Sequence, residues 1–384
     1  MKHIVIITTG CFPTGDSISF RLQMVAKAML DGGNRVTVLC RGALKDSGEW
    51  DGVRYYSLKY KNGNKIVKTG EYFAFPKRVK KYLDKNKDNI DALYLYCGQA
   101  SVFKLCKKFA KKYNKGLIRD CPDWFSHEQY KFGKFSIFYQ INNRINTKIT
   151  DESFDIVAIS HFLEEHFSGR GLRTLYVPVL CDSSERTEPK EKNSDILKLF
   201  YAGMPGKKDF IGNLLEAALL LNDEERAKLR ISLVGVSRGM LIEKCGISAS
   251  VIDGCSGFLD IHGRVPKTKV LEMMEEADFL ALPRDAVARY AKAGFPSKVT
   301  ESLANATPIL CNITSDLGDY LVDGYNAIIS KDHSPKALAE ALKRSISLTP
   351  EEKNAMSKNA LDTAREKLDY HLYTDRLKKF IEEK

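Results

Sequence analysis

The first forty residues alternate short apolar runs with a helical pattern, and this alternation limits the folds open to the chain. An apolar run at His3–Thr8 is followed by a glycine-containing loop, a helical pattern at about Ser17–Asp31 and a second apolar run at Arg35–Cys40. Two strands joined by one helix have to lie parallel, with a right-handed crossover between them. We therefore expect the chain to open on the parallel sheet of an α/β fold.

The same alternation returns in the second half of the chain. Strands are expected at Lys198–Tyr201, Arg230–Val234 and Phe279–Leu282, with helices between them. The segment between the two halves has almost no apolar residue, which is typical of a linker. The sequence therefore predicts an N-terminal domain over 1–181, a polar linker over 182–195, a C-terminal domain over 196–365 and a last helical segment over 366–384.

Composition indicates an ordinary cytoplasmic protein. The 384 residues are enough for two domains with large cores. No apolar run approaches the ~18 to 20 residues of a membrane span, and Met1-Lys2-His3 leads into a strand rather than a signal peptide. Nine cysteines without a C-x-x-C pair argue against a disulfide framework and a zinc site. We therefore expect a reducing compartment.

The positive charge is concentrated in the first half of the chain. From Arg54 to Lys148 there are 22 Lys and Arg against 7 Asp and Glu, whereas the whole chain carries a net charge of +11. This asymmetry indicates an anionic partner: membrane headgroups, nucleic acid or an acidic substrate. The helical pattern Val102–Tyr113 has one apolar face and many lysines, which fits a helix packed inward with a solvated face or a helix lying on anionic lipid.

Aromatic and basic residues interleave between Lys131 and Ile149. Such a segment could stack the bases of single-stranded nucleic acid or dock a lipid-linked acceptor. The more common arrangement is an amphipathic helix with its aromatic side chains in the core.

The stretch from Ala293 to Leu310 reads as a loop, a helix and a strand. Pro296 suits a helix start because it needs no amide donor there, and Ser297 can cap the amides that follow. Lys298 adds a full positive charge to that helix end, and Glu301 lies one turn further in. The pattern indicates a site for a diphosphate beside sugar hydroxyls; an ordinary capped helix would show it too.

This stretch resembles the nucleotide-sugar site of the retaining GT-B glycosyltransferases of family four, in the pattern Gly-Phe-Pro-Ser-Lys-x-x-Glu over residues 294–301. The resemblance implies an α/β fold of two Rossmann-like domains facing each other across a cleft. It also implies that Ser297 and Lys298 meet the donor diphosphate and that Glu301 holds the nucleotide ribose. Ala293 stands where the family usually carries a second glutamate.

The resemblance extends over roughly residues 195–345 and assigns further residues. In the loop after the strand Lys198–Tyr201, Met204 replaces the usual arginine, which leaves Lys208 or its neighbour Lys207 as the phosphate-binding cation. The segment around Val265 lies where the family's backbone reads the nucleobase. In all, the expected catalytic residues are Lys208, Lys298 and Glu301. The expected donor-binding residues are Gly10, Gly15, Gly203, Lys207, Val265 and Ser297. The helix after residue 366 is expected to cross back to the first domain.

Two further residues are candidates for contact with the acceptor. Asp120 follows the strand Gly116–Arg119, at the end of a parallel strand where ligand-facing residues gather, and the family often has a histidine about there. A carboxylate cannot copy a neutral imidazole, so a cap for the following segment is the preferred interpretation of Asp120. His161 lies at a strand-to-helix turn, where a lone histidine is more often structural.

The leading hypothesis is a glycosyltransferase, a hexosyltransferase by resemblance, that moves a sugar from a nucleoside-diphosphate sugar such as a UDP-sugar to a hydroxyl of a glycan or lipid-linked acceptor. No D-x-D occurs, so we expect no divalent metal and no cofactor. The resemblance implies retention and, together with the basic first half, a role in bacterial surface polysaccharide or lipopolysaccharide synthesis. The charge of residues 54–148 is the basis for expecting a peripheral place at the inner face of the membrane. The alternatives are a nucleotide-sugar epimerase of the same fold and a non-catalytic membrane- or nucleic-acid-binding protein, although no nucleic-acid partner is expected.

Overall fold

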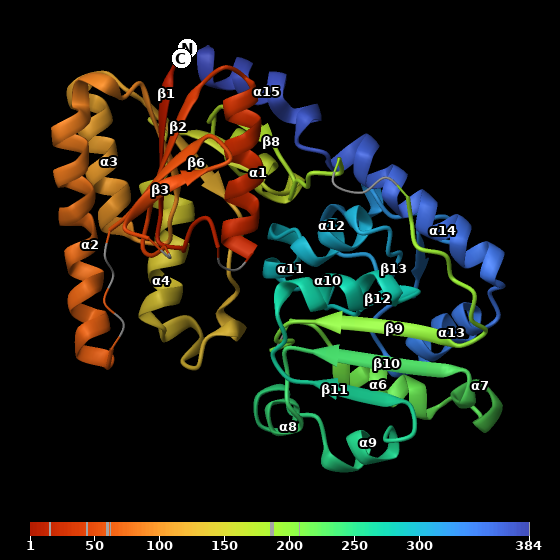
Figure 1. Cartoon of the computed structure of the whole chain (residues 1–384). Coiled ribbons are helices and arrows are strands. Elements are labelled where there is room, and N and C mark those ends of the chain that lie inside the picture. Colours follow the sequence, from red (N-terminus) through yellow and green to blue (C-terminus); the bar gives the residue numbers. More distant parts are fainter. Residues whose placement is uncertain are drawn as a thin grey trace. The chain divides into compact units, whose positions relative to one another are not determined.

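The computed structural model describes the chain except residues 15–16, 44, 59–60, 62, 185–187, 207 and 384 (Figure 1). Its internal contacts divide the chain into two units. Unit 1 comprises Met1–Leu180, Ala293–Phe295 and Tyr370–Lys384, and unit 2 comprises Cys181–Lys292 and Pro296–Asp369. Each unit is an α/β sandwich around one sheet, so the expected two-domain α/β class is confirmed.

Unit 1 is built on an eight-stranded sheet with the order β3-β4-β2-β1-β5-β6-β7-β8. All neighbours are parallel except the β3–β4 pair at one edge. The expected opening is confirmed, since β1 and β2 pair in parallel and α1 joins them. The strands are β1 His3–Thr8, β2 Arg35–Cys40, β3 Ser47–Trp50, β4 Val53–Ser57, β5 Ala92–Tyr96, β6 Gly116–Cys121, β7 Asp155–Ala158 and β8 Thr174–Tyr176.

Helices cover both faces of this sheet, with α1 and α15 packed together and α2 packed on α3 (Figure 1). On α1 the apolar residues recur every three or four positions, so Leu22, Val25 and Met29 all point into the core. Leu377 and Phe380 of α15 join the same core, which attaches the end of the chain to unit 1. The helices are α1 Ser17–Asp31, α2 Lys65–Asn86, α3 Ala100–Tyr113, α4 Ile137–Arg144, α5 His161–Ser168 and α15 His371–Glu382.

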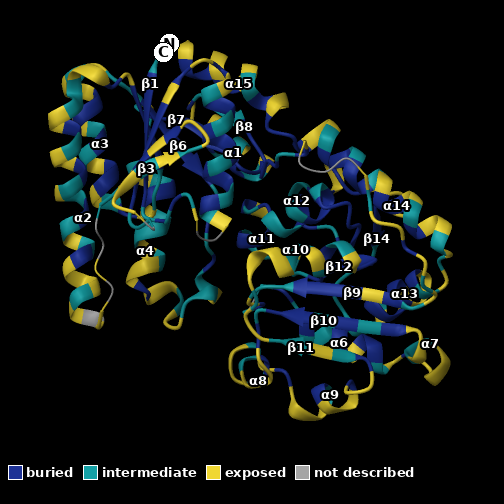
Figure 2. Cartoon of the chain, in the orientation of Figure 1, coloured by how far each residue is buried: buried dark blue, intermediate teal, exposed yellow. Residues whose placement is uncertain are grey.

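The lysine-rich helix α3 packs inward, as the first of its two interpretations expects. Val102, Phe103 and Cys106 are fully buried, whereas most of its lysines lie on the outer face. Figure 2 shows the same division on most helices, with buried inner faces and exposed outer faces. All nine cysteines are described, and none forms a disulfide.

Unit 2 is built on a six-stranded, wholly parallel sheet with the order β11-β10-β9-β12-β13-β14. Its strands are β9 Leu197–Ala202, β10 Leu229–Val234, β11 Leu259–His262, β12 Phe279–Leu282, β13 Ile309–Cys311 and β14 Ala327–Ile329. Its helices are α6 Ile211–Leu219, α7 Asp223–Ala227, α8 Arg238–Cys245, α9 Ala249–Gly254, α10 Lys267–Glu276, α11 Arg289–Ala293, α12 Ser297–Ala304, α13 Pro335–Ile346 and α14 Pro350–Thr363. Because every strand points the same way, their carboxyl ends form one edge.

Part of the polar segment between the halves is fixed to unit 2. The Lys192 ammonium is buried and donates hydrogen bonds to the Glu275 and Ala277 carbonyl oxygens, the second at 2.7 Å. Burial lowers the pKa of Lys192 to about 8, because a charged amine is costly away from water. A sequence without apolar residues can thus still be anchored, through a lysine that satisfies buried carbonyl groups. No helix in the described part of the chain is both long and apolar enough to cross a bilayer.

Candidate functional site

The helix α12 begins without a side-chain cap. Pro296 occupies the N-cap position and Ser297 is the first helical residue, so the expected cap by Ser297 is wrong. A capping side chain belongs to the residue that precedes the helix, from which it can reach the first amides. Ser297 is already part of the first turn, so its hydroxyl is not in that position. Val299 and Leu303 bury one face of the helix and fix its direction. The N-cap residue therefore supplies no side-chain cap to the first turn, in which the Val299 amide donates to the Pro296 carbonyl oxygen at 3.0 Å.

Three side chains converge on the buried carboxylate of Asp209. Lys298 Nζ donates to Oδ2 at 2.9 Å, Arg284 Nε donates to Oδ1 at 2.8 Å, and the Tyr201 hydroxyl donates to Oδ2 at 2.7 Å. The Asp209 side chain is only 3% exposed. Burial alone would raise the pKa of Asp209, but the charges of Lys298 and Arg284 outweigh it and lower that pKa. Asp209 is therefore an anion that fixes two cations.

The three partners of Asp209 come from different elements that meet at the carboxyl edge of the sheet. Tyr201 lies on β9, Arg284 follows β12, and Lys298 lies in the first turn of α12. The Asn312 side chain fixes the backbone of Arg284. It accepts a hydrogen bond from the Arg284 amide at 2.9 Å and donates one to the Arg284 carbonyl oxygen at 2.8 Å. The Lys298 ammonium also lies 4.9 Å from the centre of the Tyr201 ring, a cation–π contact. The group carries two positive charges and one negative charge.

Gly203 lets the backbone pass close to Lys298. Its φ is +114°, and a Cβ there would lie 3.3 Å from Lys298 Cε. Gly235, directly after β10, makes a similar close approach. Its φ is +86°, and a Cβ added there would lie 3.3 Å from the Gly203 nitrogen. Side chains rarely adopt such φ values, so both positions suit glycine. The expected donor residue Gly203 thus lies beside Lys298 in unit 2.

Lys208 adds another cation next to Asp209 in the chain. Its ammonium lies 5.7 Å from the centre of the Tyr290 ring on α11. Lys207, the other expected cation of this loop, lies outside the described residues. Met204, in the position of the family arginine, is exposed. Arg284 is therefore the arginine that the structure places at Lys298 and Asp209.

Glu301 lies one turn beyond Ser297 on α12 and is half-buried. Burial raises the pKa of Glu301. The charges of Lys267 and Lys298 and a hydrogen bond with the Ser297 side chain act in the opposite direction but do not outweigh burial. Ser297 and Glu301, which were expected to contact different parts of the donor, are thus in contact with each other through their side chains. Val265 lies between β11 and α10, in the loop that follows the carboxyl end of its strand.

The unit 1 candidates divide into a tight glycine turn and two paired side chains. Gly10 follows β1, and a Cβ there would lie 2.8 Å from Ile18 Cγ2, so the turn requires glycine. Gly15 lies outside the described residues. His161 begins α5, contacts Glu164 Oε2 at 2.9 Å through Nδ1 and stacks on Tyr176 with ring centres 4.0 Å apart. These contacts orient an exposed imidazole.

Asp120 has a structural partner that the sequence did not indicate. Arg21 of α1 donates hydrogen bonds to both carboxylate oxygens of Asp120, from Nη2 to Oδ1 at 2.8 Å and from Nε to Oδ2 at 3.0 Å. The Asp120 side chain has no exposed surface. Arg21 also donates to the carbonyl oxygens of Val177 and Pro178, at 3.1 and 2.7 Å. The acceptor and cap interpretations of Asp120 are both corrected, because its carboxylate is occupied in a buried ion pair.

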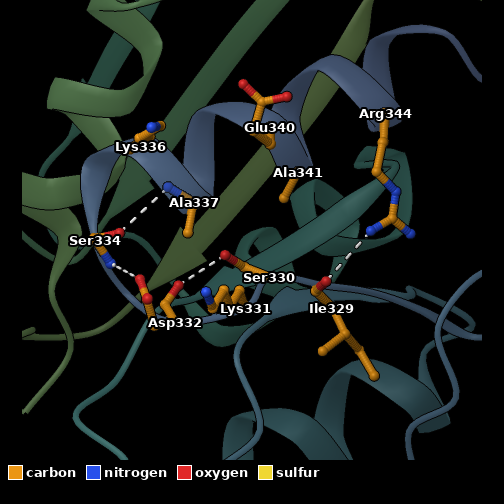
Figure 3. Close-up of a pocket in the computed structure, with 10 residues that line it drawn as sticks. All are labelled: Ile329, Ser330, Lys331, Asp332, Ser334, Lys336, Ala337, Glu340, Ala341 and Arg344. Atoms are coloured by element: carbon orange, nitrogen blue, oxygen red, sulfur yellow. Dashed lines mark hydrogen bonds between the residues drawn. The ribbon is translucent and has the colours of Figure 1, made fainter.

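A pocket of about 540 Å³ opens elsewhere in unit 2, beside the first turns of α13 (Figure 3). None of the expected site residues lines it. Its helix start is already satisfied, because Ser334 Oγ accepts from the Ala337 amide at 3.3 Å and Asp332 accepts from the Ser334 amide at 2.8 Å. We therefore assign it no ligand.

Sequence reasoning missed Asp209, Tyr201 and Arg284. Two of them carried a usable signal: Tyr201 lies in an expected strand and Arg284 directly follows one, and strand ends are where parallel sheets gather ligand-facing groups. In the described residues no group of three or more His, Cys, Asp or Glu side chains is placed to hold a metal ion.

Comparisons with known proteins relate the chain to one family and to several solved structures. Residues 183–363 match the family described as glycosyl transferases group 1. No curated protein matches the chain by sequence. Among solved structures the chain is similar to a sucrose-phosphate synthase from Thermosynechococcus elongatus, with a TM-score of 0.77 and 13% identity over 100% of this chain and 99% of that one.

Two other solved structures share the fold over nearly their whole length. Anabaena Alr3699/HepE, in complex with UDP and glucose, has a TM-score of 0.72 and 12% identity, with 100% of both chains covered. WaaG, a glycosyltransferase involved in lipopolysaccharide biosynthesis, has a TM-score of 0.69 and 14% identity over 98% of this chain and 99% of that one. The expected GT-B fold is confirmed.

Proposed function

We propose that this protein, a glycosyltransferase with a group 1 domain over residues 183–363, transfers a sugar from a nucleoside-diphosphate sugar to an acceptor hydroxyl. One observation carries the proposal: Asp209 holds Lys298 and Arg284 at the uncapped start of α12. Two fixed cations beside a helix start whose N-cap residue gives no side-chain cap suit a ligand with at least two negative charges. The diphosphate of the donor is such a ligand.

The same groups can stabilise the reaction as well as binding. When the bond from the sugar to the diphosphate breaks, negative charge grows on the departing phosphate oxygen. Lys298, Arg284, Lys208 and the first amides of α12 neutralise that charge. Because Asp209 already fixes the first two side chains, little reorganisation is needed during the reaction, which is the condition for strong electrostatic catalysis.

The remaining donor contacts follow from the same helix and sheet edge. We propose that the Glu301 carboxylate accepts hydrogen bonds from the ribose hydroxyls, with Ser297 beside it and the diphosphate one turn earlier. Gly203 brings the backbone close to Lys298, leaving room for the phosphate. The backbone around Val265 contacts the base. Gly10 of unit 1 would contact the sugar side of the donor, and His161 is the remaining candidate on the acceptor side.

We further propose that no cofactor or divalent metal takes part, because protein cations occupy the role that a metal would have at the diphosphate. Retention of anomeric configuration follows the family pattern over residues 294–301, and we assign no nucleophile. UDP is the proposed nucleotide, which is supported by the similarity to a protein in complex with UDP and glucose.

The acceptor proposed is a glycan or lipid-linked hydroxyl in bacterial surface polysaccharide or lipopolysaccharide synthesis. The similarity to WaaG supports this assignment. Such an acceptor lies at the inner face of a membrane, and the basic region 54–148 fits a peripheral position there.

A thermal-shift screen against UDP, GDP, ADP, CMP and their sugars tests the donor assignment, first without metal and then with magnesium. A ligand at a hundred times its dissociation constant adds about 2.7 kcal/mol to the free energy of unfolding, which is an easily measured shift. We expect a response to one nucleoside diphosphate that is lost in Lys298→Ala and Glu301→Ala. A protein that responds to none of them would refute the proposed donor site.

A further inference from the structure

An exposed apolar feature lies in unit 1, in the segment that follows β6 and in the first turn of α4. We call it the aromatic tip, made of the apolar residues Phe132, Phe135, Ile137 and Phe138 and the lysines Lys131 and Lys134. Phe135 is 94% exposed, and the other three apolar side chains are between 65% and 69% exposed. Core packing of these aromatic residues, the more common arrangement for such a pattern, is therefore wrong here, and α4 buries none of its residues.

The backbone of the aromatic tip is held by its own hydrogen bonds. The amides of Phe135 and Ser136 donate to the carbonyl oxygens of Phe132 and Gly133 at 3.0 and 3.1 Å. The Gln140 side chain donates to the Lys134 carbonyl oxygen at 2.7 Å. The apolar side chains are thus presented from a folded turn, although each exposed phenyl ring costs free energy in water. A surface of this kind indicates a partner.

The charge around the aromatic tip indicates the chemistry of its partner. No Asp or Glu occurs between Gln129 and Thr150, whereas Lys131, Lys134, Arg144 and Lys148 all do. In Figure 1 the start of α2 reaches the same end of unit 1 as the aromatic tip. That part of α2 carries the exposed apolar residues Ile66 and Phe73. Exposed apolar side chains beside an excess of cations, with Glu128 as an exposed carboxylate just before this segment, fit a surface that is apolar in its interior and negatively charged at its face.

We propose that the aromatic tip inserts into the headgroup region of an anionic lipid bilayer. The phenyl rings and Ile137 enter the boundary between headgroups and acyl chains, while Lys131 and Lys134 contact lipid phosphates. A protein partner would cover the rings with a matching surface and would gain little from a rim in which basic residues outnumber acidic ones. The inference names a partner for the membrane position given under the proposed function, and it does not depend on the donor.

Vesicle co-sedimentation tests the aromatic tip directly. The full chain is mixed with vesicles of phosphatidylcholine alone and with vesicles of equal parts phosphatidylcholine and phosphatidylglycerol. We expect binding to the anionic vesicles that weakens about tenfold or more in the double variant Phe135→Ser with Phe138→Ser. Replacing Lys131 and Lys134 by Gln should weaken it about fivefold for each lysine.

Matched controls use exposed residues of unit 2, Leu220→Ser and Lys358→Gln, which should bind vesicles as the wild type does. Failure of the wild type to bind anionic vesicles, or equal binding by the Phe variant, would overturn the inference. A wild-type dimer that the Phe variant converts to a monomer would overturn it too, in favour of self-association. A nucleotide-induced thermal shift in the Phe variant shows that a loss of vesicle binding is not a loss of the donor site.

Discussion

Removing the Asp209 carboxylate in Asp209→Asn should destabilise unit 2 by a large and calculable amount. Taking one partner out of a buried ion pair costs about 3 to 5 kcal/mol, since the other charge remains without compensation. Here the side chains of Lys298 and Arg284 are 28% and 12% exposed, so water screens part of that cost. We therefore expect the free energy of unfolding to fall by about 2.5 kcal/mol. For a unit of this size that is about 5 to 10 °C in Tm.

The assay is thermal and urea unfolding followed by far-ultraviolet circular dichroism. Both tryptophans of the chain, Trp50 and Trp124, lie in unit 1, so tryptophan fluorescence would report on the wrong unit. The control is Asp253→Asn, which breaks an exposed pair with Arg238 and should change the stability little. Equal effects of the two substitutions would refute the claim that Asp209 fixes buried cations.

The difference in unfolding free energy between the wild type and Asp209→Asn should depend on pH with a definite sign. The folded pKa of Asp209 lies below the ordinary value of 3.8 for an aspartate, so the folded state favours the ionised form. The stability that Asp209 adds is therefore fully present above that value and is lost as the pH falls through the folded pKa. The stability gap between wild type and Asp209→Asn should be constant near neutral pH and shrink in acid. A gap that widens in acid would contradict the argument.

Three further substitutions test the site in other ways. Lys298→Ala should lower turnover roughly a hundredfold or more, because one preorganised donor contributes about 2.7 to 4 kcal/mol to transition-state stabilisation; an unchanged kcat in a steady-state assay would contradict this. Glu301→Gln should weaken nucleoside diphosphate binding about tenfold, measured by calorimetry, because a charged acceptor of the ribose hydroxyls is lost. Gly203→Ala should lower both Tm and donor affinity, whereas Gly239→Ala, in open space on α8, should lower neither.

The sequence predicted the fold well where apolar periodicity is strong. The bounds of β1, α1 and β2 agree with expectation to the residue, because each strand is a continuous apolar run and the helix repeats its apolar positions. β3 was missed, because Ser47–Trp50 is a short, polar edge strand whose position depends on pairing with β4.

The site was harder to predict, because its central residue acts through partners distant in sequence. Asp209 has no signal of its own, and it becomes recognisable only when the sheet brings Arg284 and Lys298 to it. Asp120 shows the same limit, since its partner Arg21 lies on a helix ninety-nine positions earlier. The aromatic tip shows another, because the pattern of Phe135 and Phe138 fits a buried helix as well as an exposed one.

The most direct test of the central claim is a calorimetric titration of the wild-type protein with UDP and, separately, with uridine. Uridine has the same base and ribose but lacks the diphosphate that Lys298 and Arg284 are proposed to hold. We predict that UDP binds about a hundredfold more tightly than uridine, since hydrogen bonds to charged groups contribute about 1.5 to 3 kcal/mol each. Lys298→Ala should remove most of that difference. Equal affinities of the wild type for UDP and uridine would contradict the account.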